Sequence, residues 1–187
     1  MHRALQGKEA TERFARERQI LASLRHDHLC RLYDGGLTDD RRPYVVLEFV
    51  AGRTLIEHCE QNKLNSIERI RLFRQALEGI AHAHAEGIIH RDLKPSNLLV
   101  QRGVSAEPDP AQGAQEVGDA PVASAKDRLV VVDFGIARPA AGSDLTRTGL
   151  ALGTPGYLAP EVMRSATVSV ATDVFALGAV LFELLTG

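Results

Sequence analysis

The octapeptide HRDLKPSN, residues 90–97, constrains this chain more than any other stretch. It places a carboxylate, an ammonium group and a carboxamide within six positions, and Pro95 prevents a helix from continuing through them. Pro95 also favours an extended backbone at Lys94. Short apolar runs follow this stretch, so we expect a loop that a folded core holds in place and that directs polar side chains toward one point.

Composition places the chain among globular proteins and excludes some partners. Its 187 residues suit one domain or two small lobes, with 44% hydrophobic and 25% charged residues. A net charge of −2 argues against nucleic acid or an anionic membrane as the main partner. Cys30 and Cys59 have no metal-ligand or redox spacing, so we expect reduced, buried thiols.

No targeting or membrane segment is expected within these residues. The first twenty residues are charged throughout, unlike a signal peptide. The longest apolar run, Val174 to Phe182, is too short to span a bilayer, which needs about 20 residues. We therefore expect a cytoplasmic domain, and an anchor elsewhere in a full-length protein stays open.

Hydrophobic periodicity predicts a mixed helix and strand pattern in the first half. The spacing predicts a helix from about Glu9 to Leu24 and strands over Leu29 to Tyr33 and Pro43 to Val50. The glycines of 34–36 and the aspartates at 39–40 predict the turn between these strands.

The second half predicts a long helix, a strand pair and a buried final helix. With Ser66 as N-cap, a helix should run to about Glu86, with Ile70, Phe73, Leu77 and Ile80 on one face and Gly87 ending it. Residues 98–100 and 129–132 should form a buried strand pair. Residues 171–185 are apolar nearly all round, which predicts a helix in the centre of a lobe.

Residues 101–128 differ from the rest. They are rich in Ala, Gly, Pro and acidic residues and contain no aromatic residue and no Leu, Ile or Met. Hairpin connections usually take roughly 2–5 residues, so we interpret this segment as a disordered insertion without a core of its own.

Two further motifs follow the octapeptide, and their order along the chain is informative. DFG, residues 133–135, comes after an apolar run, and GTPGYLAPE occupies residues 153–161. DFG alone would be weak support, but its place between HRDLKPSN and APE resembles the eukaryotic-type protein kinases, and the phrasing resembles bacterial members. The resemblance covers the chain from about Phe14 to its last residue, apart from the insertion.

The resemblance implies an α+β, protein-kinase-like two-lobe fold. Residues 1–50 would be a partial N-lobe with helix C and strands, without the Gly-rich loop and the lysine strand. Residues 51–187 would be a partial, mainly helical C-lobe that carries the disordered insertion 101–128.

The resemblance also implies a reaction, transfer of the ATP γ-phosphate to Ser or Thr hydroxyls of protein substrates. Asp92 would orient the substrate hydroxyl, and Lys94 would neutralise charge on the moving phosphoryl group. Asn97 and Asp133 offer hard oxygen ligands that suit Mg²⁺. Lys94 and Thr154 resemble the serine/threonine branch, with Thr154 close to the hydroxyl site.

The nucleotide would contact a second set of residues by the same resemblance. Leu47 matches the gatekeeper position, Glu48 and Val50 match positions whose backbone pairs with adenine, and Leu99 would lie beneath the ring. The alternative for 47–50 is a plain strand end. Its place between a hairpin and the long helix favours the hinge.

Glu17 is ambiguous from the residues alone, because it lies on the apolar stripe of the first helix, where a carboxylate is costly to bury. Alone, it is better interpreted as solvated at the stripe edge. In the family this glutamate pairs with the ATP-site lysine, and Lys8 is too close in sequence to replace that lysine.

A regulatory interpretation attaches to Arg91, which in similar kinases pairs with a phosphate on the activation loop. Thr146 and Thr148 are the candidate acceptors, and capping of turns is the alternative for these hydroxyls. The resemblance is compatible with autophosphorylation in a dimer of the full-length protein. Asp173 would brace the catalytic loop backbone.

Histidines could suggest a metal site, but His82, His84 and His90 lack a completing carboxylate or thiol at the usual spacing. We expect His84 and His90 to pack and hydrogen-bond within the lobe. We expect residues 26–28, His-Asp-His, to be an exposed loop.

No GxGxxG spacing and no lysine strand occur in these residues. We therefore expect a serine/threonine kinase domain truncated at both ends, with very weak or no activity as this chain. The alternative is a non-catalytic pseudokinase or scaffold, which the intact Asp92, Asn97 and Asp133 argue against. A small-molecule kinase is less favoured, because residues 153–161 match the peptide-binding segment of protein kinases.

Overall fold

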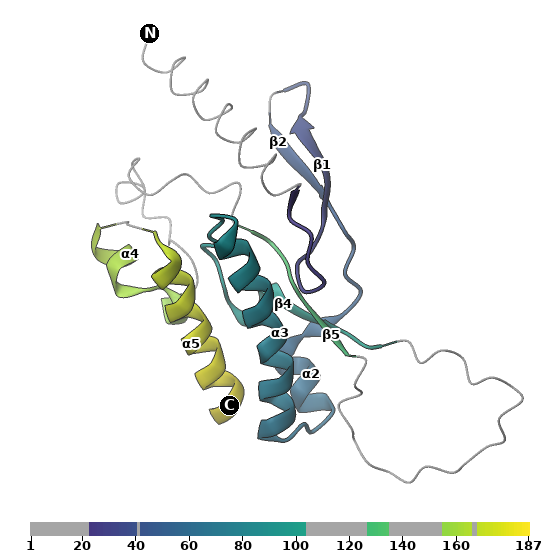
Figure 1. Cartoon of the computed structure of the whole chain (residues 1–187), viewed down its shortest axis with the longest axis vertical. Coiled ribbons are helices and arrows are strands. Elements are labelled where there is room, and N and C mark those ends of the chain that lie inside the picture. The colour runs from purple at the N-terminus through teal and green to yellow at the C-terminus, as the bar shows by residue number, and fades with distance from the viewer. Residues whose placement is uncertain (1–22, 41, 104–126, 135–154, 166–167) are drawn as a thin grey trace, which may run out of the picture.

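The computed structural model describes residues 23–40, 42–103, 127–134, 155–165 and 168–187. The predicted helix from Glu9 to Leu24 lies outside these residues, apart from its last two. Two sheets and four helices are present in the described part (Figure 1). The helices are α2 (Leu55–Gln61), α3 (Ser66–Ala85), α4 (Pro160–Ser165) and α5 (Val170–Thr186), with 3-10 turns η1 (Pro95–Asn97) and η2 (Pro155–Tyr157).

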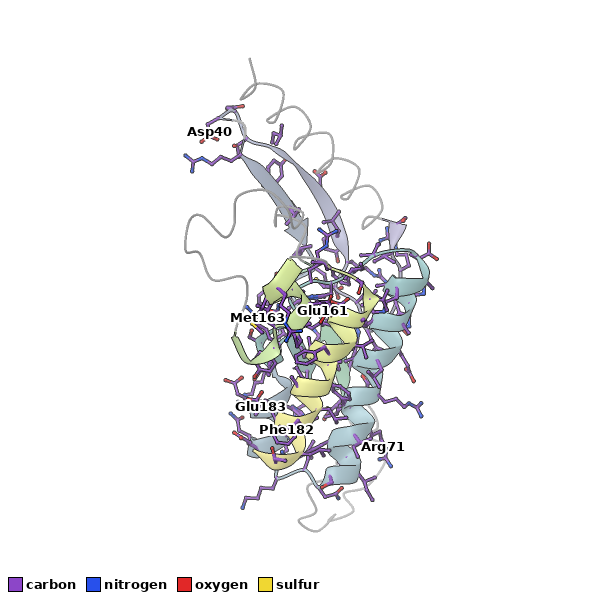
Figure 2. The ribbon with its side chains drawn as sticks, turned by 90° about the vertical axis from the view of Figure 1, so that its left-hand side faces the viewer. Asp40, Arg71, Glu161, Met163, Phe182 and Glu183 are labelled. Carbon is purple, nitrogen blue, oxygen red and sulfur yellow. The ribbon has the colours of Figure 1, made fainter. Side chains whose placement is uncertain are left out.

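A hairpin of β1 (Leu32–Leu37) and β2 (Pro43–Leu47) projects from one end of the molecule. Asp40 lies at its tip, away from the helices (Figure 2). The predicted turn is confirmed at Asp39–Asp40 and wrong at 34–36, because residues 34–36 belong to β1, whose register shifts between Leu32 and Asp34. Glycines in a strand commonly mark such an irregularity. The chain reverses over 38–42, where Thr38 N–H donates to Arg42 O at 2.9 Å.

The second sheet has the order β3–β4–β5, with β3 at Arg53–Thr54, β4 at Leu98–Gln101 and β5 at Arg128–Val131. The predicted strand pair is confirmed, and it is antiparallel, with Leu98 opposite Val131. Gln101 pairs with Arg128, so both residues belong to strands and the connection between them is shorter than 101–128. Residues 104–126 lie outside the described part.

A buried clasp holds the two ends of this connection together. Asp127 accepts a hydrogen bond from Gly103 N–H at 3.2 Å. Its other carboxylate oxygen lies 3.1 Å from His58 Nε2 on α2, and both side chains are 5% exposed. Gln75 on α3 donates to the Asp127 carbonyl at 3.1 Å. The strands are therefore fixed to two helices at the point where the connection leaves the sheet.

The N-cap of helix α3 lies one residue before the predicted one. Asn65, not Ser66, is the N-cap, and Asn65 and Glu68 form a reciprocal capping box. This arrangement satisfies backbone donors that the first helical turn leaves free. The helix ends at Ala85, and Gly87 follows with φ +75°, as a glycine after a helix typically does.

The predicted apolar face of α3 is only half right. Phe73 and Ile80 are buried, as expected, but Ile70 and Leu77 are 48% and 42% exposed. The buried face is rotated toward a different row, because the helix packs on β5 at one side and on α5 at another. Its members are Leu72, Phe73, Ala76, Gly79, Ile80 and Ala83.

Residues 26–29 lie against α3 rather than forming the exposed loop that we expected. A Cβ on Gly79 would meet His28 O at 3.0 Å, so only glycine permits this close approach without adjustment. The His26 ring stacks on the His82 ring at 5.1 Å between centroids. Both rings are half-buried.

Helix α5 is present as predicted but is buried on one side only. Asp173, Ala176, Val180 and Leu184 lie in the core, where α5 packs beside α3 and against η2 (Figure 1). The opposite side is exposed, with Phe182 at 70%. The expectation of burial all round is therefore wrong for the described part. No described helix is long and apolar enough to cross a bilayer.

Candidate active site

The polar groups of residues 90–97 converge as the loop prediction requires. Lys94 Nζ lies 3.2 Å from Asp92 Oδ2. Asn97 Nδ2 donates to the Asp92 carbonyl at 2.8 Å and lies 3.5 Å from Asp92 Oδ2. The Asp92 side chain is 13% exposed, so it reaches solvent while remaining mostly enclosed. The loop therefore presents one carboxylate flanked by a cation and a carboxamide.

Asp173, on the first turn of α5, holds this loop from below. Its Oδ2 accepts from His90 N–H at 2.8 Å, and its Oδ1 accepts from Arg91 N–H at 2.9 Å. His84 Nε2 on α3 lies 2.8 Å from the same Oδ2. The expected bracing by Asp173 is confirmed. One buried carboxylate thus joins α3, α5 and the backbone of the loop.

His90 is fully buried and links the loop to the end of β5. Asp92 N–H donates to His90 Nδ1 at 3.3 Å, so Nε2 carries the proton and donates to Val132 O at 2.9 Å. Burial lowers the pKa of His90, which keeps the ring neutral. The ring also contacts Phe134, at 4.6 Å between centroids. The expected packing role of His84 and His90 is confirmed.

Two motif residues adopt left-handed backbone conformations. Arg91 has φ +70° and Asp133 has φ +58°. Such conformations are uncommon in residues other than glycine and persist where the surroundings hold them in place. At Arg91 the hydrogen bond from its N–H to Asp173 supplies that restraint.

Asn97 and Asp133 are brought close together through the backbone. Val132 N–H donates to the Asn97 carbonyl at 2.9 Å, so Asp133 follows directly after a residue bonded to Asn97. Asn97 is buried, whereas Asp133 is exposed. A carboxamide and a carboxylate are hard donors that fit a divalent ion such as Mg²⁺. Among the described residues, no group of three or more His, Cys, Asp or Glu side chains forms a metal site.

A pocket opens beside the loop of residues 90–97. The segment after η2 faces the loop across it, and Tyr157 OH donates to Glu183 on α5. Burial, followed by this hydrogen bond, raises the pKa of Tyr157 to about 12. The residues that line the pocket are Arg91, Asp92, Leu93, Lys94, Tyr157, Leu158, Thr172, Asp173 and Ala176.

The predicted hinge residues lie where β2 ends. Leu47 is the last residue of β2, and Glu48 N–H donates to Arg31 O at 2.8 Å. Glu48 and Val50 are half-buried. Leu99, also half-buried, lies in β4 opposite Thr54 of β3.

Four predicted site residues lie outside the described part of the chain: Glu17, Thr146, Thr148 and Thr154. Sequence reasoning missed two contacts near the site. It did not pair His84 with Asp173 or Tyr157 with Glu183, because each contact joins elements far apart in sequence. The only available signal was the apolar context of Asp173 and Glu183, since a carboxylate there needs a donor.

Comparison with known proteins identifies the family. The protein kinase domain family matches residues 1–187. The chain belongs to the protein kinase family. Kinase relatives include PrkC of Bacillus subtilis, 37% identical over 96% of this chain, and PknB of Mycobacterium tuberculosis, 36% identical over 94% of it. Both are named serine/threonine-protein kinases, and the chain spans 24% and 25% of their lengths.

Solved kinase structures agree with the fold. The kinase fold of this chain matches Rad53 in complex with AMP-PNP at a TM-score of 0.65 and 28% identity, over 94% of this chain and 38% of that one. It also matches the PknI kinase domain of Mycobacterium tuberculosis at 0.61 and 23% identity, over 95% of this chain and 57% of that one. The described elements therefore form part of a two-lobe kinase fold, whose family implies ATP and a divalent metal.

Proposed function

We propose that the chain is part of a serine/threonine protein kinase that transfers the γ-phosphate of ATP to protein hydroxyls. The observation that carries this proposal is the loop carboxylate of Asp92, 3.2 Å from Lys94 Nζ and 3.5 Å from Asn97 Nδ2. Phosphoryl transfer needs an oriented hydroxyl and positive charge around the moving group. This loop supplies a carboxylate that can orient the hydroxyl and an ammonium group that provides the positive charge.

Asp92 is proposed to orient the substrate hydroxyl and to accept its proton. Asn97 Nδ2 donates to the Asp92 backbone carbonyl and lies 3.5 Å from Asp92 Oδ2, so it restrains the Asp92 backbone and approaches one carboxylate oxygen. Lys94 is proposed to donate to the transferring phosphoryl group, whose negative charge its ammonium offsets. Thr154 is proposed to complete the hydroxyl site beside these residues.

Asn97 and Asp133 are proposed to hold Mg²⁺. When bound, the ion would neutralise phosphate charge between the nucleotide and the loop. The side chain of Asn97 is held by its bond to the Asp92 carbonyl, and its oxygen accepts only a long hydrogen bond from Ser96 Oγ at 3.5 Å among the described residues. Asp133, exposed two residues after the end of β5, would supply a second oxygen ligand.

Adenine is proposed to contact the segment from Leu47 to Val50. The backbone of Glu48 and Val50 would pair with the base, Leu47 would be the gatekeeper, and Leu99 would lie beneath the ring. Leu99 is half-buried on β4, so part of its side chain is accessible.

Regulation is proposed to involve Arg91, which lies in the wall of the catalytic pocket. A phosphate on Thr146 or Thr148 would pair with its guanidinium. Glu17 is proposed to pair with the lysine of an ATP site, which the 187 residues do not supply at a suitable spacing. Autophosphorylation between two copies of a full-length protein is compatible with this arrangement.

The first experiment measures metal-dependent ATP binding and phosphate transfer by the purified chain. Transfer to a generic protein substrate should be very weak, because no Gly-rich loop is present. ATP binding should require Mg²⁺, and Asn97→Ala and Asp133→Asn should each abolish this metal-dependent binding because each removes a proposed metal ligand. Asp92→Asn is the matched control, since it should leave binding intact and abolish any residual transfer.

The outcomes separate the two hypotheses. Metal-dependent binding that fails in Asn97→Ala and Asp133→Asn supports a kinase site. ATP binding that ignores both the metal and these substitutions supports a non-catalytic scaffold instead. Rapid Asp92-dependent transfer would contradict the expected weakness while leaving the kinase assignment in place.

A further inference from the structure

Arg128, the first residue of β5, contacts three separate segments. Its Nε donates to the Asp27 carbonyl at 2.6 Å, before β1. Its Nη1 lies 3.2 Å from Gln101 Oε1 on β4 and 3.4 Å from Glu48 Oε1 after β2. The guanidinium therefore joins the second sheet to the hairpin at the segment proposed to bind adenine.

Glu48 is held through every polar group that it has. Its carboxylate accepts from Arg31 N–H at 3.3 Å on one oxygen and faces Arg128 with the other. Its backbone N–H donates to Arg31 O at 2.8 Å, and Cys30 Sγ lies 3.4 Å from its carbonyl. The carboxylate is anchored at both oxygens, and the Cys30 thiol donates to the backbone carbonyl, so the whole residue is restrained while one lone pair of the carbonyl stays open to another donor.

The charges in this cluster act on one another. Burial raises the pKa of Cys30 to about 11, the nearby Glu48 carboxylate adds to the rise, and Arg128 opposes it. Among the described residues, the cationic side chain paired with the Glu48 carboxylate is that of Arg128. The pair is partly exposed, at 35% for Arg128 and 19% for Glu48, so salt will weaken it.

We propose that Arg128 is a positioning residue for the adenine-binding segment, acting through the Glu48 carboxylate. This inference rests on the proposed nucleotide site. Arg128 holds the side chain of Glu48 so that the carbonyl of the same residue faces the nucleotide in a fixed direction. A preorganised acceptor binds adenine more tightly than one that must be ordered on binding.

The test has two independent readouts on the whole purified chain. The first is hydrogen exchange at the Arg31 and Glu48 amides, which should be about two- to fivefold faster in Arg128→Ala, as expected for loss of a partly exposed ion pair. The second is the Kd for adenosine, measured by calorimetry, which should rise by a similar factor. Adenosine is the probe because it needs no phosphate clamp.

Matched variants distinguish the brace, by which we mean the contact of Arg128 with the Glu48 carboxylate, from a general loosening of the sheet. Glu48→Gln should mimic Arg128→Ala, and the double variant should be no worse than either single one. Gln101→Met removes another contact of Arg128 and should leave both readouts unchanged. High salt should reproduce the Arg128→Ala exchange rates in the wild type, whereas a purely packing role would be insensitive to salt.

The two proposals fail in different ways. If Arg128→Ala, or Arg128→Gln should the alanine variant not fold, leaves exchange at Arg31 and Glu48 unchanged, the brace is refuted. Fully additive effects of the two substitutions, or no response to salt, refute it as well. A different result is that Arg128→Ala exchanges faster but the wild-type chain binds no adenosine. The contact between Arg128 and Glu48 then stands as a structural feature, and both the nucleotide site and the positioning role are refuted.

Discussion

Asp173 shows how one side chain can determine the geometry of a loop. Its two oxygens accept from His90 N–H and Arg91 N–H, and His84 on α3 approaches one of them at 2.8 Å. The carboxylate is 1% exposed, so these partners are its means of tolerating burial. The unusual backbone of Arg91, in a loop, is therefore held by a residue of helix α5.

Asp173→Ala should lower the free energy of unfolding by about 2–4 kcal/mol, because it leaves two backbone N–H groups without their acceptor. Urea denaturation followed by circular dichroism measures this loss. Asp40→Ala is the control, since Asp40 pairs with Arg42 at an exposed hairpin tip and should change stability by less than about 1 kcal/mol. Equal effects of the two substitutions would contradict the bracing role.

His26 should make stability depend on pH. Burial lowers its pKa in the folded state, and His28 and His82 lower it further, against Asp27 and Glu78. The unfolded chain therefore binds more protons, so stability rises with pH and is lost as pH falls below the ordinary histidine value. His90 acts in the same direction because of its burial.

His26→Gln should flatten this dependence without abolishing it, since His90 remains. Urea midpoints at several pH values between about 5 and 8 measure the slope for both proteins. Identical slopes would show that the stacked His26 and His82 rings do not affect protonation.

Helix α3 and strand β1 show where pattern alone was sufficient and where it was not. The ends of α3 follow from local residues such as Glu68 and Gly87, so its bounds were predictable to within one residue. Its orientation about its own axis was not, because β5 and α5 decide which row is covered. The glycines of β1 carried a turn signal, yet pairing with β2 made them strand.

The same limit applies to the candidate site. Asp92, Lys94 and Asn97 lie within one loop, so sequence spacing brought them together correctly. Arg128 and Tyr157 act across long separations in the chain, and no local pattern reports such contacts.

Two apolar residues on α3 give a direct test of its orientation. Ile80, 2% exposed, should cost about 2–5 kcal/mol when changed to alanine, because a cavity remains in the core. Leu77, 42% exposed on the same helix, should cost less than about 1 kcal/mol. Chemical denaturation of Ile80→Ala and Leu77→Ala compares them. Similar losses would favour the face originally predicted from the sequence.

At the scale of the whole molecule, the core lies between α2, α3, α5 and the sheet of β4 and β5. It is assembled from segments on both sides of residues 104–126, for example Leu98, Leu129 and Val180. The Asp127 clasp to His58 and Gly103 keeps those segments together independently of what lies between them.

Replacing residues 104–126 with a short Gly-Ser linker should therefore leave the thermal midpoint unchanged or slightly higher, because loop-closure entropy depends only weakly on length. Asp127→Ala should instead destabilise the chain by about 3 kcal/mol, since it strands His58 in a buried site. Differential scanning calorimetry measures both. A large loss on loop replacement would give the insertion a structural role.

The contacts of Asp173 also set an order of events during synthesis. The residues that it holds precede it by 82, 83 and 89 positions. A chain growing from the ribosome has made the whole of α3 and the loop long before α5 emerges. The loop backbone then lacks its acceptor, and contacts of such long sequence separation form late. The backbone of residues 90–97 should consequently stay without this acceptor until α5 has emerged, so the loop is held in its folded geometry only from that point on.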